Sequence, residues 1–168
     1  IYFRAKEGKE QYNASKEEYN AAMISLCSQL ASNYISLRTY QAQKIVAENN
    51  ILSQMAILSI TETRFNTGLA SALDVAQAKT VYLGTRASIP QLEAAIDNQI
   101  NIIAVLLGKY PNEIYNRLVT PCEQVDFMQI VSVGIPYDLL RRRPDIRQAE
   151  YNIAAQAAAV GIAVTDFL

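Results

Sequence analysis

The sequence predicts an all-α fold made of a long antiparallel coiled-coil helical hairpin, a short mixed segment and a C-terminal helix. The stretch from about Lys6 to Asn66 has no proline and a single glycine near its start, which is typical of one long uninterrupted helix. A second helical pattern begins a few residues later, beyond Gly68. Because so short a connection makes two helices antiparallel neighbours, we expect a hairpin over residues 1–109 with its tip near 66–72.

The first arm of the hairpin carries apolar residues at helical spacing on two adjacent faces. One row has the steps of a coiled coil and consists of Tyr12, Tyr19, Met23, Leu26, Leu30, Tyr34 and Leu37. The row beside it consists of Ile24, Cys27, Ala31, Ile35 and Val46. Two apolar faces predict contacts with more than one neighbouring helix, and the tyrosines of the first row are expected to pack.

The tip contains residues suited to end one helix and to start the next. Gly68 can adopt the left-handed backbone conformation that follows a helix end, where a Cβ would clash. Ser71 can cap the second helix, and Asp74 completes an S-x-x-D capping pattern with its carboxylate near the positive helix end. A second interpretation makes Asp74 a partner in an ion pair between helices at the tip.

The second arm is expected from residue 72 to about residue 107. Its apolar row consists of Ile89, Leu92, Ile96, Ile100, Ile103 and Leu107. Pro90 removes one backbone hydrogen bond to the carbonyl of Arg86, so we expect a kink or local unwinding there. Gly108 followed by Pro111 is a typical helix end.

The remaining residues predict a change of structure and then a return to helix. Residues 110–135 contain two prolines and a glycine, and favour an extended or mixed segment with one short helix. Residues 136–168 predict a brief turn and then a helix from Asp145 to about Ala163, preceded by Pro144, a favourable first helical residue. Its packed face is expected to consist of Ile146, Ala149, Ile153, Gln156, Val160 and Ala163.

Composition argues against several classes of function. The net charge of -1 gives no overall attraction to nucleic acid, and no run approaches the 18 apolar residues of a membrane-spanning helix. The chain has no histidine, the usual general base and a common metal ligand, and it has no Gly-rich phosphate loop and no metal-ligand spacing. We therefore expect no enzyme activity, no cofactor and no metal.

The cysteines and the first residues carry little functional information. Cys27 and Cys122 are too few for a disulfide framework and are interpreted as unpaired. The first ten residues have mixed charge and no apolar core, so no signal peptide is expected there. Without an initiator methionine, the chain is expected to be part of a longer protein.

A cluster of arginines lies near the start of the last helix. Its members are Arg141, Arg142, Arg143 and Arg147, and the nearby acidic residues are Asp138, Asp145 and Glu150. A phosphate or nucleic-acid site would need stacking aromatic residues and a basic surround, which this sequence lacks. Pairing of the arginines with the nearby carboxylates is therefore the favoured interpretation.

Three motifs resemble those of the TolC-type outer membrane factors of tripartite efflux pumps and type I secretion systems. They are Arg64-Phe65-x-x-Gly68-Leu69-x-Ser71-x-Leu73-Asp74-Val75, Leu106-Leu107-Gly108, and the segment from Pro136 to Glu150 that contains Arg141-Arg142-Arg143-Pro144-Asp145-Ile146-Arg147. The resemblance covers nearly the whole chain and is closest to the branch that serves resistance-nodulation-division pumps. It implies a trimeric channel with a β-barrel in the outer membrane and a helical barrel across the periplasm.

The resemblance also assigns roles to parts of this chain. It makes residues 1–109 the helical hairpin of the first repeat, 110–135 the equatorial linker, and 136–168 the turn and first helix of the second repeat, ending before a barrel strand. Membrane contact would occur only through barrel strands that this sequence does not contain. No nucleic acid is implied as a partner.

The implied site residues lie at the tip and in the arginine-rich motif. Gly68, Leu69, Ala70 and Ser71 would contact a periplasmic adaptor, the membrane fusion protein, and through it an inner-membrane pump. Asp74 would belong to the polar network that keeps the tip closed. Arg141, Arg142, Arg143, Pro144, Asp145 and Arg147 would form a structural collar.

The resemblance implies the export of drugs or other small molecules. The alternative from another class is a structural or adhesive coiled-coil protein without transport activity. That alternative explains the apolar rows of the hairpin, but it does not explain the collar or the arginine-rich motif.

Overall fold

The computed structural model describes residues 1–121 and 136–167, and every element in these ranges is an α-helix. The five helices are α1 (Tyr2–Asn66), α2 (Ala72–Leu106), α3 (Pro111–Leu118), α4 (Pro136–Arg142) and α5 (Pro144–Asp166). The predicted all-α fold is confirmed. Cys122 and most of the predicted mixed segment, from residue 122 to 135, lie outside the described residues. The division at residues 109 and 135 stays a prediction.

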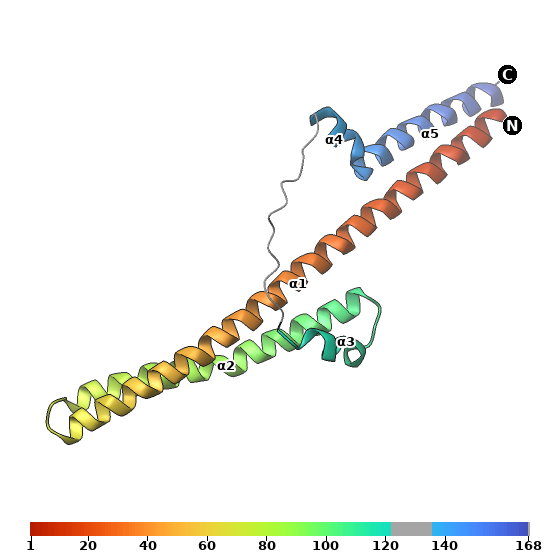
Figure 1. Cartoon of the computed structure of the whole chain (residues 1–168). Coiled ribbons are helices and arrows are strands. Elements are labelled where there is room, and N and C mark those ends of the chain that lie inside the picture. The colour runs from red at the N-terminus through yellow and green to blue at the C-terminus, as the bar shows by residue number, and fades with distance from the viewer. Residues whose placement is uncertain (122–135, 168) are drawn as a thin grey trace. The chain divides into compact units, whose positions relative to one another are not determined.

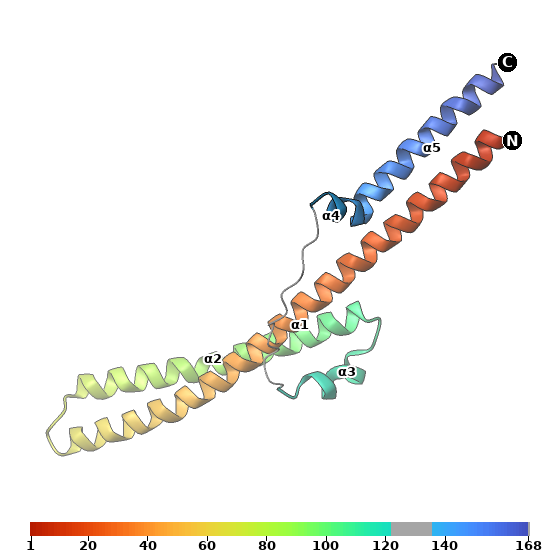
Figure 2. The ribbon, with the colours of Figure 1, turned by 45° about the horizontal axis from the view of Figure 1, so that its top comes forward.

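The chain divides into two compact units, and α1 contributes its first part to one and its second part to the other. One unit is residues 30–125, where the second part of α1 and the whole of α2 lie side by side and antiparallel (Figures 1 and 2). Its core consists of Leu37, Ile96, Ile100, Ile103, Ala104 and Ile114, with Leu30, Tyr34, Tyr40 and Leu118 at the edge. The central residues of the predicted α2 row are therefore buried as expected. Leu107 is exposed because α2 ends at Leu106.

The other unit combines residues 1–29 with residues 126–168, and in its described part α5 runs antiparallel to the start of α1. Contacts along the pair join Phe3 to Gly161, Arg4 to Asp166 and Glu17 to Arg147. The buried residues between these contacts are mostly small and consist of Ala14, Glu17, Ala155 and Ala158. Alanine on both helices lets their backbones approach closely, so the described parts of α1 and α5 pack through small side chains.

Two predicted packing faces are left uncovered by the other helix of this unit. In the predicted row of α1, Tyr12 is 70% exposed and Tyr19 is 65% exposed, and Met23 and Leu26 are exposed too. The predicted face of α5 is also largely exposed, with Ile153 at 71%. The helices meet instead through their alanine-rich sides, because small residues permit the closest approach and the large apolar side chains are left pointing away from that contact.

Of the two expectations for Pro90, local unwinding is wrong, and a kink stays a prediction. Helix α2 continues through Pro90 without interruption, so the chain is not unwound there. Pro90 and Arg86 are both exposed, so water can hydrate the Arg86 carbonyl that has lost its donor. The missing hydrogen bond is tolerated because it lies on the solvent side of the helix.

Candidate functional site

The tip of the hairpin is built by a helix-ending motif centred on Gly68. Gly68 has a φ of 77°, its N–H donates to the Phe65 carbonyl at 3.0 Å, and the Leu69 N–H donates to the Arg64 carbonyl at 2.8 Å. This pair of hydrogen bonds is a Schellman motif, which satisfies carbonyls at the end of α1 and turns the chain. The left-handed conformation predicted for Gly68 is confirmed.

Helix α2 begins at Ala72, and its N-cap residue Ser71 forms a complete capping box with Asp74. The Ser71 hydroxyl accepts the Asp74 N–H at 3.2 Å, and the Ser71 N–H donates to Asp74 Oδ2 at 2.8 Å. The Ser71 hydroxyl also donates to Asp74 Oδ2, at 2.8 Å. The Ser71 N–H, and then its hydroxyl, stabilise the carboxylate and hold the pKa of Asp74 below its usual value. The predicted capping role is confirmed, and Asp74 is ionised at neutral pH.

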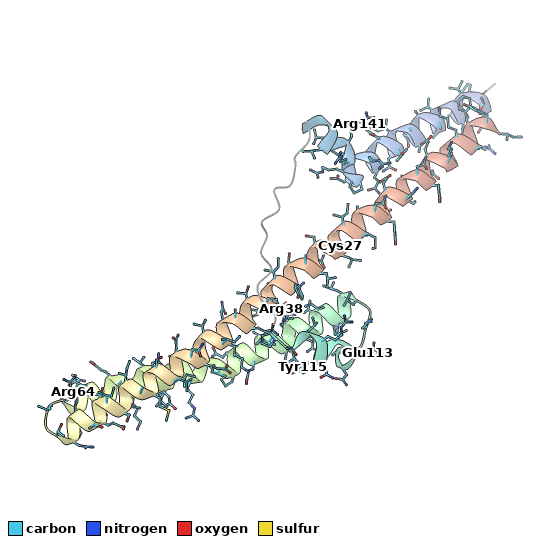
Figure 3. The ribbon with its side chains drawn as sticks, viewed as in Figure 1. Cys27, Arg38, Arg64, Glu113, Tyr115 and Arg141 are labelled. Carbon is cyan, nitrogen blue, oxygen red and sulfur yellow. The ribbon has the colours of Figure 1, made fainter. Side chains whose placement is uncertain are left out.

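The surface of the tip is open and partly apolar. Leu69 is 74% exposed, and Phe65 and Leu73 are also exposed. A Cβ added to Gly68 would meet no atom within 4 Å, so its φ, not a lack of space, is what favours glycine there. The tip thus presents an exposed leucine on a capped and well-defined turn. Side chains from another pair of helices can pack against such a surface. Figure 3 labels Arg64 beside this turn.

The other end of the hairpin has polar contacts that the sequence analysis missed. Lys44 Nζ on α1 lies 2.8 Å from Glu93 Oε1 on α2, and this contact raises the pKa of Lys44. The Tyr115 hydroxyl on α3 donates to Asp97 Oδ1 on α2 at 3.1 Å, which raises the pKa of Tyr115. Gln41 is only 4% exposed. The spacing of Gln41 and Lys44 could have indicated that they face the core, because they follow the buried Leu37 by steps of four and three residues.

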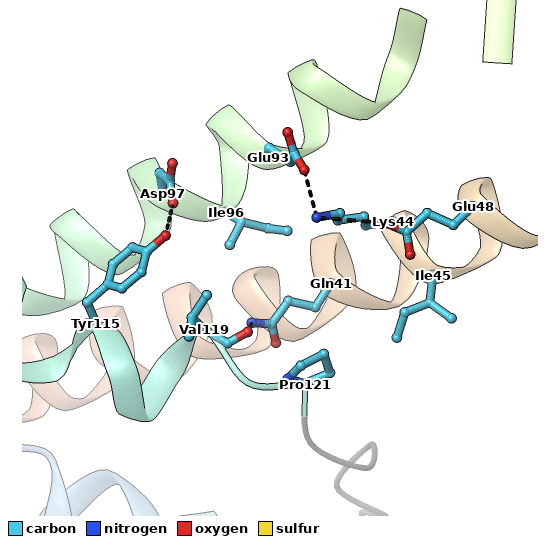
Figure 4. A pocket seen from close by; sticks show the side chains of 10 residues that line it. All are labelled: Gln41, Lys44, Ile45, Glu48, Glu93, Ile96, Asp97, Tyr115, Val119 and Pro121. Atoms are coloured by element: carbon cyan, nitrogen blue, oxygen red, sulfur yellow. Dashed lines mark hydrogen bonds and ion pairs between the residues drawn. The ribbon is translucent and has the colours of Figure 1, made fainter. Parts of the chain in front are cut away.

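These residues line a cleft of about 340 Å³ within the same unit (Figure 4). Its lining combines apolar and charged side chains and consists of Gln41, Lys44, Ile45, Glu48, Glu93, Ile96, Asp97, Tyr115, Val119 and Pro121. The one lysine in this lining, Lys44, forms ion pairs with Glu93 at 2.8 Å and with Glu48 at 3.8 Å. The polar groups of the cleft therefore serve to join the three helices.

The arginine cluster is held by two different acidic residues. Arg143 pairs with Asp145 through two hydrogen bonds of 3.1 and 2.6 Å, which raise the pKa of Arg143 and lower that of Asp145. Arg147 Nη2 lies 2.8 Å from Oε1 of Glu17 on α1, a carboxylate outside the predicted cluster. Arg141 and Arg142 lie on α4 with exposed side chains, and Pro144 is the first residue of α5. The side chain of Asp138 lies outside the described part of the chain.

In the described ranges, no group of three or more histidine, cysteine, aspartate or glutamate residues is placed to hold a metal ion. Among the helices described, none combines the length and the apolar character needed to cross a membrane. Cys27 is a free, exposed cysteine.

Comparison with known proteins gives one consistent result. Residues 4–109 match the model of a family described as outer membrane efflux protein. Nodulation protein T of Rhizobium leguminosarum bv. trifolii is 31% identical over 164 residues, which are 97% of this chain and 35% of the relative. The probable efflux pump outer membrane protein TtgC of Pseudomonas putida is 32% identical over 159 residues, 94% of this chain and 32% of the relative.

A solved structure agrees with these sequence matches. The outer-membrane channel OprN has a TM-score of 0.93 and 33% sequence identity, covering 100% of this chain and 38% of that chain. The present chain therefore spans about a third of the length of the proteins that it matches.

Proposed function

The chain belongs to the outer membrane efflux protein family, and on that premise we propose that it is the periplasmic helical region of a trimeric channel that docks a periplasmic adaptor. The family consists of outer-membrane channel and transport proteins, and the helical part of such channels lies in the periplasm. The adaptor would connect the channel to an inner-membrane pump. In this proposal the exported substrates are drugs or other small molecules; the name of the TtgC relative refers to an efflux pump.

The docking proposal is based on one observation, the geometry of the tip. Leu69 is 74% exposed on a turn whose two ends are both fixed by hydrogen bonds. A protein surface held in one conformation loses little entropy when a partner binds it, and an exposed leucine supplies apolar area to bury. Gly68, Leu69, Ala70 and Ser71 are the docking residues in this proposal.

Asp74 has a second role in the same proposal. Its carboxylate is ionised and fully exposed, and among the described residues Ser71 supplies its hydrogen bonds. Three protomers would bring three such carboxylates around one axis, where they would repel one another and attract cations. We assign Asp74 to the network that sets the closed state and its ion preference.

The experiment that tests docking is site-specific cross-linking of the intact protein in cells. Cys27 and Cys122 are replaced by serine, Ser71 is replaced by cysteine, and a bifunctional thiol- and amine-reactive reagent is added. We expect an adduct with the mass of the protein plus one adaptor. The matched control keeps the exposed Cys27 as its single cysteine, far along α1 from the tip, and should give no such adduct. Correctly inserted protein that gives no adduct at Ser71 would remove the docking assignment.

A further inference from the structure

Two contacts between α1 and α5 differ from the alanine packing that lies between them. At one end the ring of Phe3 lies over Gly161, so that a Cβ added to this glycine would be 2.6 Å from Cδ1 of the ring. At the other end Arg147 Nη2 lies 2.8 Å from Oε1 of Glu17. Phe3 and Glu17 are 14 residues apart on α1, and Gly161 and Arg147 are 14 residues apart on α5. The two contacts are therefore separated by two heptads on both helices.

Gly161 is an unusual residue for its position in α5. It lies in the interior of the helix, where glycine is less favourable than alanine. Alanines such as Ala158 and Ala159 precede it, so alanine is the common small residue of this helix. Only the absence of a Cβ leaves room for the ring of Phe3. We therefore interpret Gly161 as the seat of this ring.

The alanine contacts between these two points do not define how the helices are aligned along their axes. Ala14 of α1 and Ala155 and Ala158 of α5 are buried and have side chains of one size. If the helices slid past each other by seven residues, or about 10 Å, one row of small side chains would replace another. The alanine packing alone would therefore accept more than one register of α1 against α5.

The two other contacts oppose such a slip in both directions. Ala154 is seven residues from Gly161 and seven residues from Arg147. A slip in one direction places the ring of Phe3 against Ala154, whose Cβ fills the space that Gly161 leaves open. A slip in the other direction places Glu17 opposite Ala154, so that its buried carboxylate loses Arg147. Each direction thus meets its own obstacle.

We propose that the Phe3–Gly161 and Glu17–Arg147 contacts together select the register of α1 against α5. Phe3 and Glu17 are positioning residues in this proposal, because they decide which residues of α5 face α1. The alanines supply close packing, and the two contacts make one alignment of that packing more favourable than the others.

The register also sets the relative height of exposed apolar residues on the two helices. Tyr12 and Tyr19 are exposed on α1, and Ile153 and Val160 are exposed on α5. In a closed ring of identical chains, neighbours that cover both sets must meet them at the same height in every chain, because an offset would add up around the ring. This consequence rests on the proposed trimer, whereas the register itself does not.

The test measures the distance between two spin labels within one chain of the intact protein. The labels are placed at the exposed residues 15 on α1 and 163 on α5, in a background without Cys27 and Cys122. An excess of the same variant without label sites is co-expressed, so that the measured distances arise within one chain. Because the labels report the register whether or not the chains assemble, a failure of the proposed trimer would leave this measurement valid.

Two double variants are compared with the parent. Phe3→Ala/Glu17→Ala removes both contacts and leaves alanine at both places on α1. Phe3→Ala/Arg4→Ala is the matched control, because the Arg4–Asp166 pair is 3.6 Å long and exposed on both sides. We expect the first variant to add a second component to the distance distribution, displaced by about 10 Å. The control should keep the distribution of the parent, because the Glu17–Arg147 contact remains.

Two outcomes would overturn the proposal. A distribution like that of the parent in Phe3→Ala/Glu17→Ala would mean that the register is set elsewhere. Loss of hydrogen-exchange protection throughout α5 in this variant would mean that the two contacts hold the helices together and do not select their register.

Gly161→Ala tests the contact with the ring separately. The added methyl group should collide with Phe3 and raise hydrogen exchange in α5 on the order of tenfold. Gly84→Ala is the control, because it adds the same group at an open position inside α2, and it should not raise exchange there. In a Phe3→Ala background, Gly161→Ala should have no such effect. An increase that persists without the ring, or no increase with it, would contradict the role given to Phe3.

Discussion

Ser71 and Asp74 fix the start of α2 through short-range chemistry that involves no other part of the chain. Each satisfies a backbone N–H of the other, and together they bring a negative charge to the positive end of the helix. Because Gly68 completes the turn with two further local hydrogen bonds, the tip retains its shape without buried side chains. The proposed docking surface is therefore held by hydrogen bonds within the tip itself.

Removal of the Ser71 hydroxyl should loosen the first turn of α2. We expect Ser71→Ala to destabilise this helix end by about 1 kcal/mol, the usual contribution of an N-cap side chain. Ser59→Ala is the matched control, since Ser59 is an exposed serine in the interior of α1. Amide protection factors for residues 74–78 measure the effect. Equal protection in the parent and in Ser71→Ala would show that the cap contributes nothing to the tip.

The pH dependence of the same turn follows from the lowered pKa of Asp74. A carboxyl whose pKa is lower in the folded state contributes stability above its unfolded value, near 3.8, and loses it as the pH falls through the folded value. Protection of the first turn of α2 should therefore be constant at neutral pH and decrease only below 3.8. In Asp74→Asn this decrease should be absent. A decrease that persists in Asp74→Asn must come from another group.

Local sequence patterns predicted the tip correctly because its hydrogen bonds join residues at most five positions apart. Local patterns do not indicate the partner of Arg147, which is Glu17 on another helix, 130 positions earlier in the chain. Nor do they indicate the partners of Gln41, which are the carbonyls of Leu118, the last residue of α3, and Val119, the residue after it. Spacing shows that such a residue lies on a packed face, but it does not identify which distant backbone group will face it.

At the scale of elements, the contact between α1 and α5 depends on small residues around an ion pair in which only Glu17 is buried. Glu17 is 4% exposed and also accepts a hydrogen bond from Asn20 at 3.1 Å, whereas the Arg147 side chain is 44% exposed. The two partners are therefore not equivalent. Arg147 can be hydrated if it loses Glu17, but Glu17 without Arg147 would leave a buried charge unpaired.

This asymmetry predicts which of two substitutions destabilises the packing of α5 more. Arg147→Ala should lower the free energy of opening of α5 by about 2–3 kcal/mol, and Glu17→Gln by about 1 kcal/mol. Arg4→Ala is the control, because the Arg4–Asp166 pair is 3.6 Å long and exposed on both sides, so its loss should cost less than about 0.5 kcal/mol. Hydrogen exchange along α5 of the intact protein gives all three values. An effect of Arg147→Ala no larger than that of Arg4→Ala would contradict the argument.

The sequence predicts which segments form helices better than it predicts which face of each helix is packed. The spacing of the large residues of α5, such as Ile153 and Val160, predicts a packed face, but the structure leaves both exposed. Alanine rows were the better indicator, because Ala155 and Ala158 are buried and allow close approach. A row of large apolar residues shows which face would gain from being covered, but whether a single chain covers it depends on the tertiary arrangement.

At the scale of the whole molecule, the exposed apolar row of α1 bears on the proposed assembly. Tyr12, Tyr19, Met23 and Leu26 have the spacing of a coiled-coil seam and are all exposed in the single chain. Burial of such a row against neighbouring helices would be favourable by about 25 cal/mol for each Å² of apolar surface covered. The row is therefore consistent with the trimer that we propose for the intact protein.

Substitution of Gly68 connects the geometry of the tip to the activity of the assembled protein. The φ of 77° is tolerated by asparagine better than by other non-glycine residues, and the space around the position is open. Gly68→Asn should therefore retain the turn and most of the efflux activity. Gly68→Glu should place a carboxylate in the docking surface, where its desolvation without a partner opposes binding.

Accumulation of a fluorescent efflux substrate in cells that contain each variant provides the measurement. We expect Gly68→Glu to reduce efflux at least about tenfold, because an unpaired charge at an interface costs several kcal/mol. The variant protein must still reach the outer membrane in normal amount, and its cross-linking to the adaptor through Ser71→Cys must decrease in parallel. Normal efflux by Gly68→Glu would mean that the adaptor binds elsewhere, whereas low efflux with undiminished cross-linking would place the defect in channel opening.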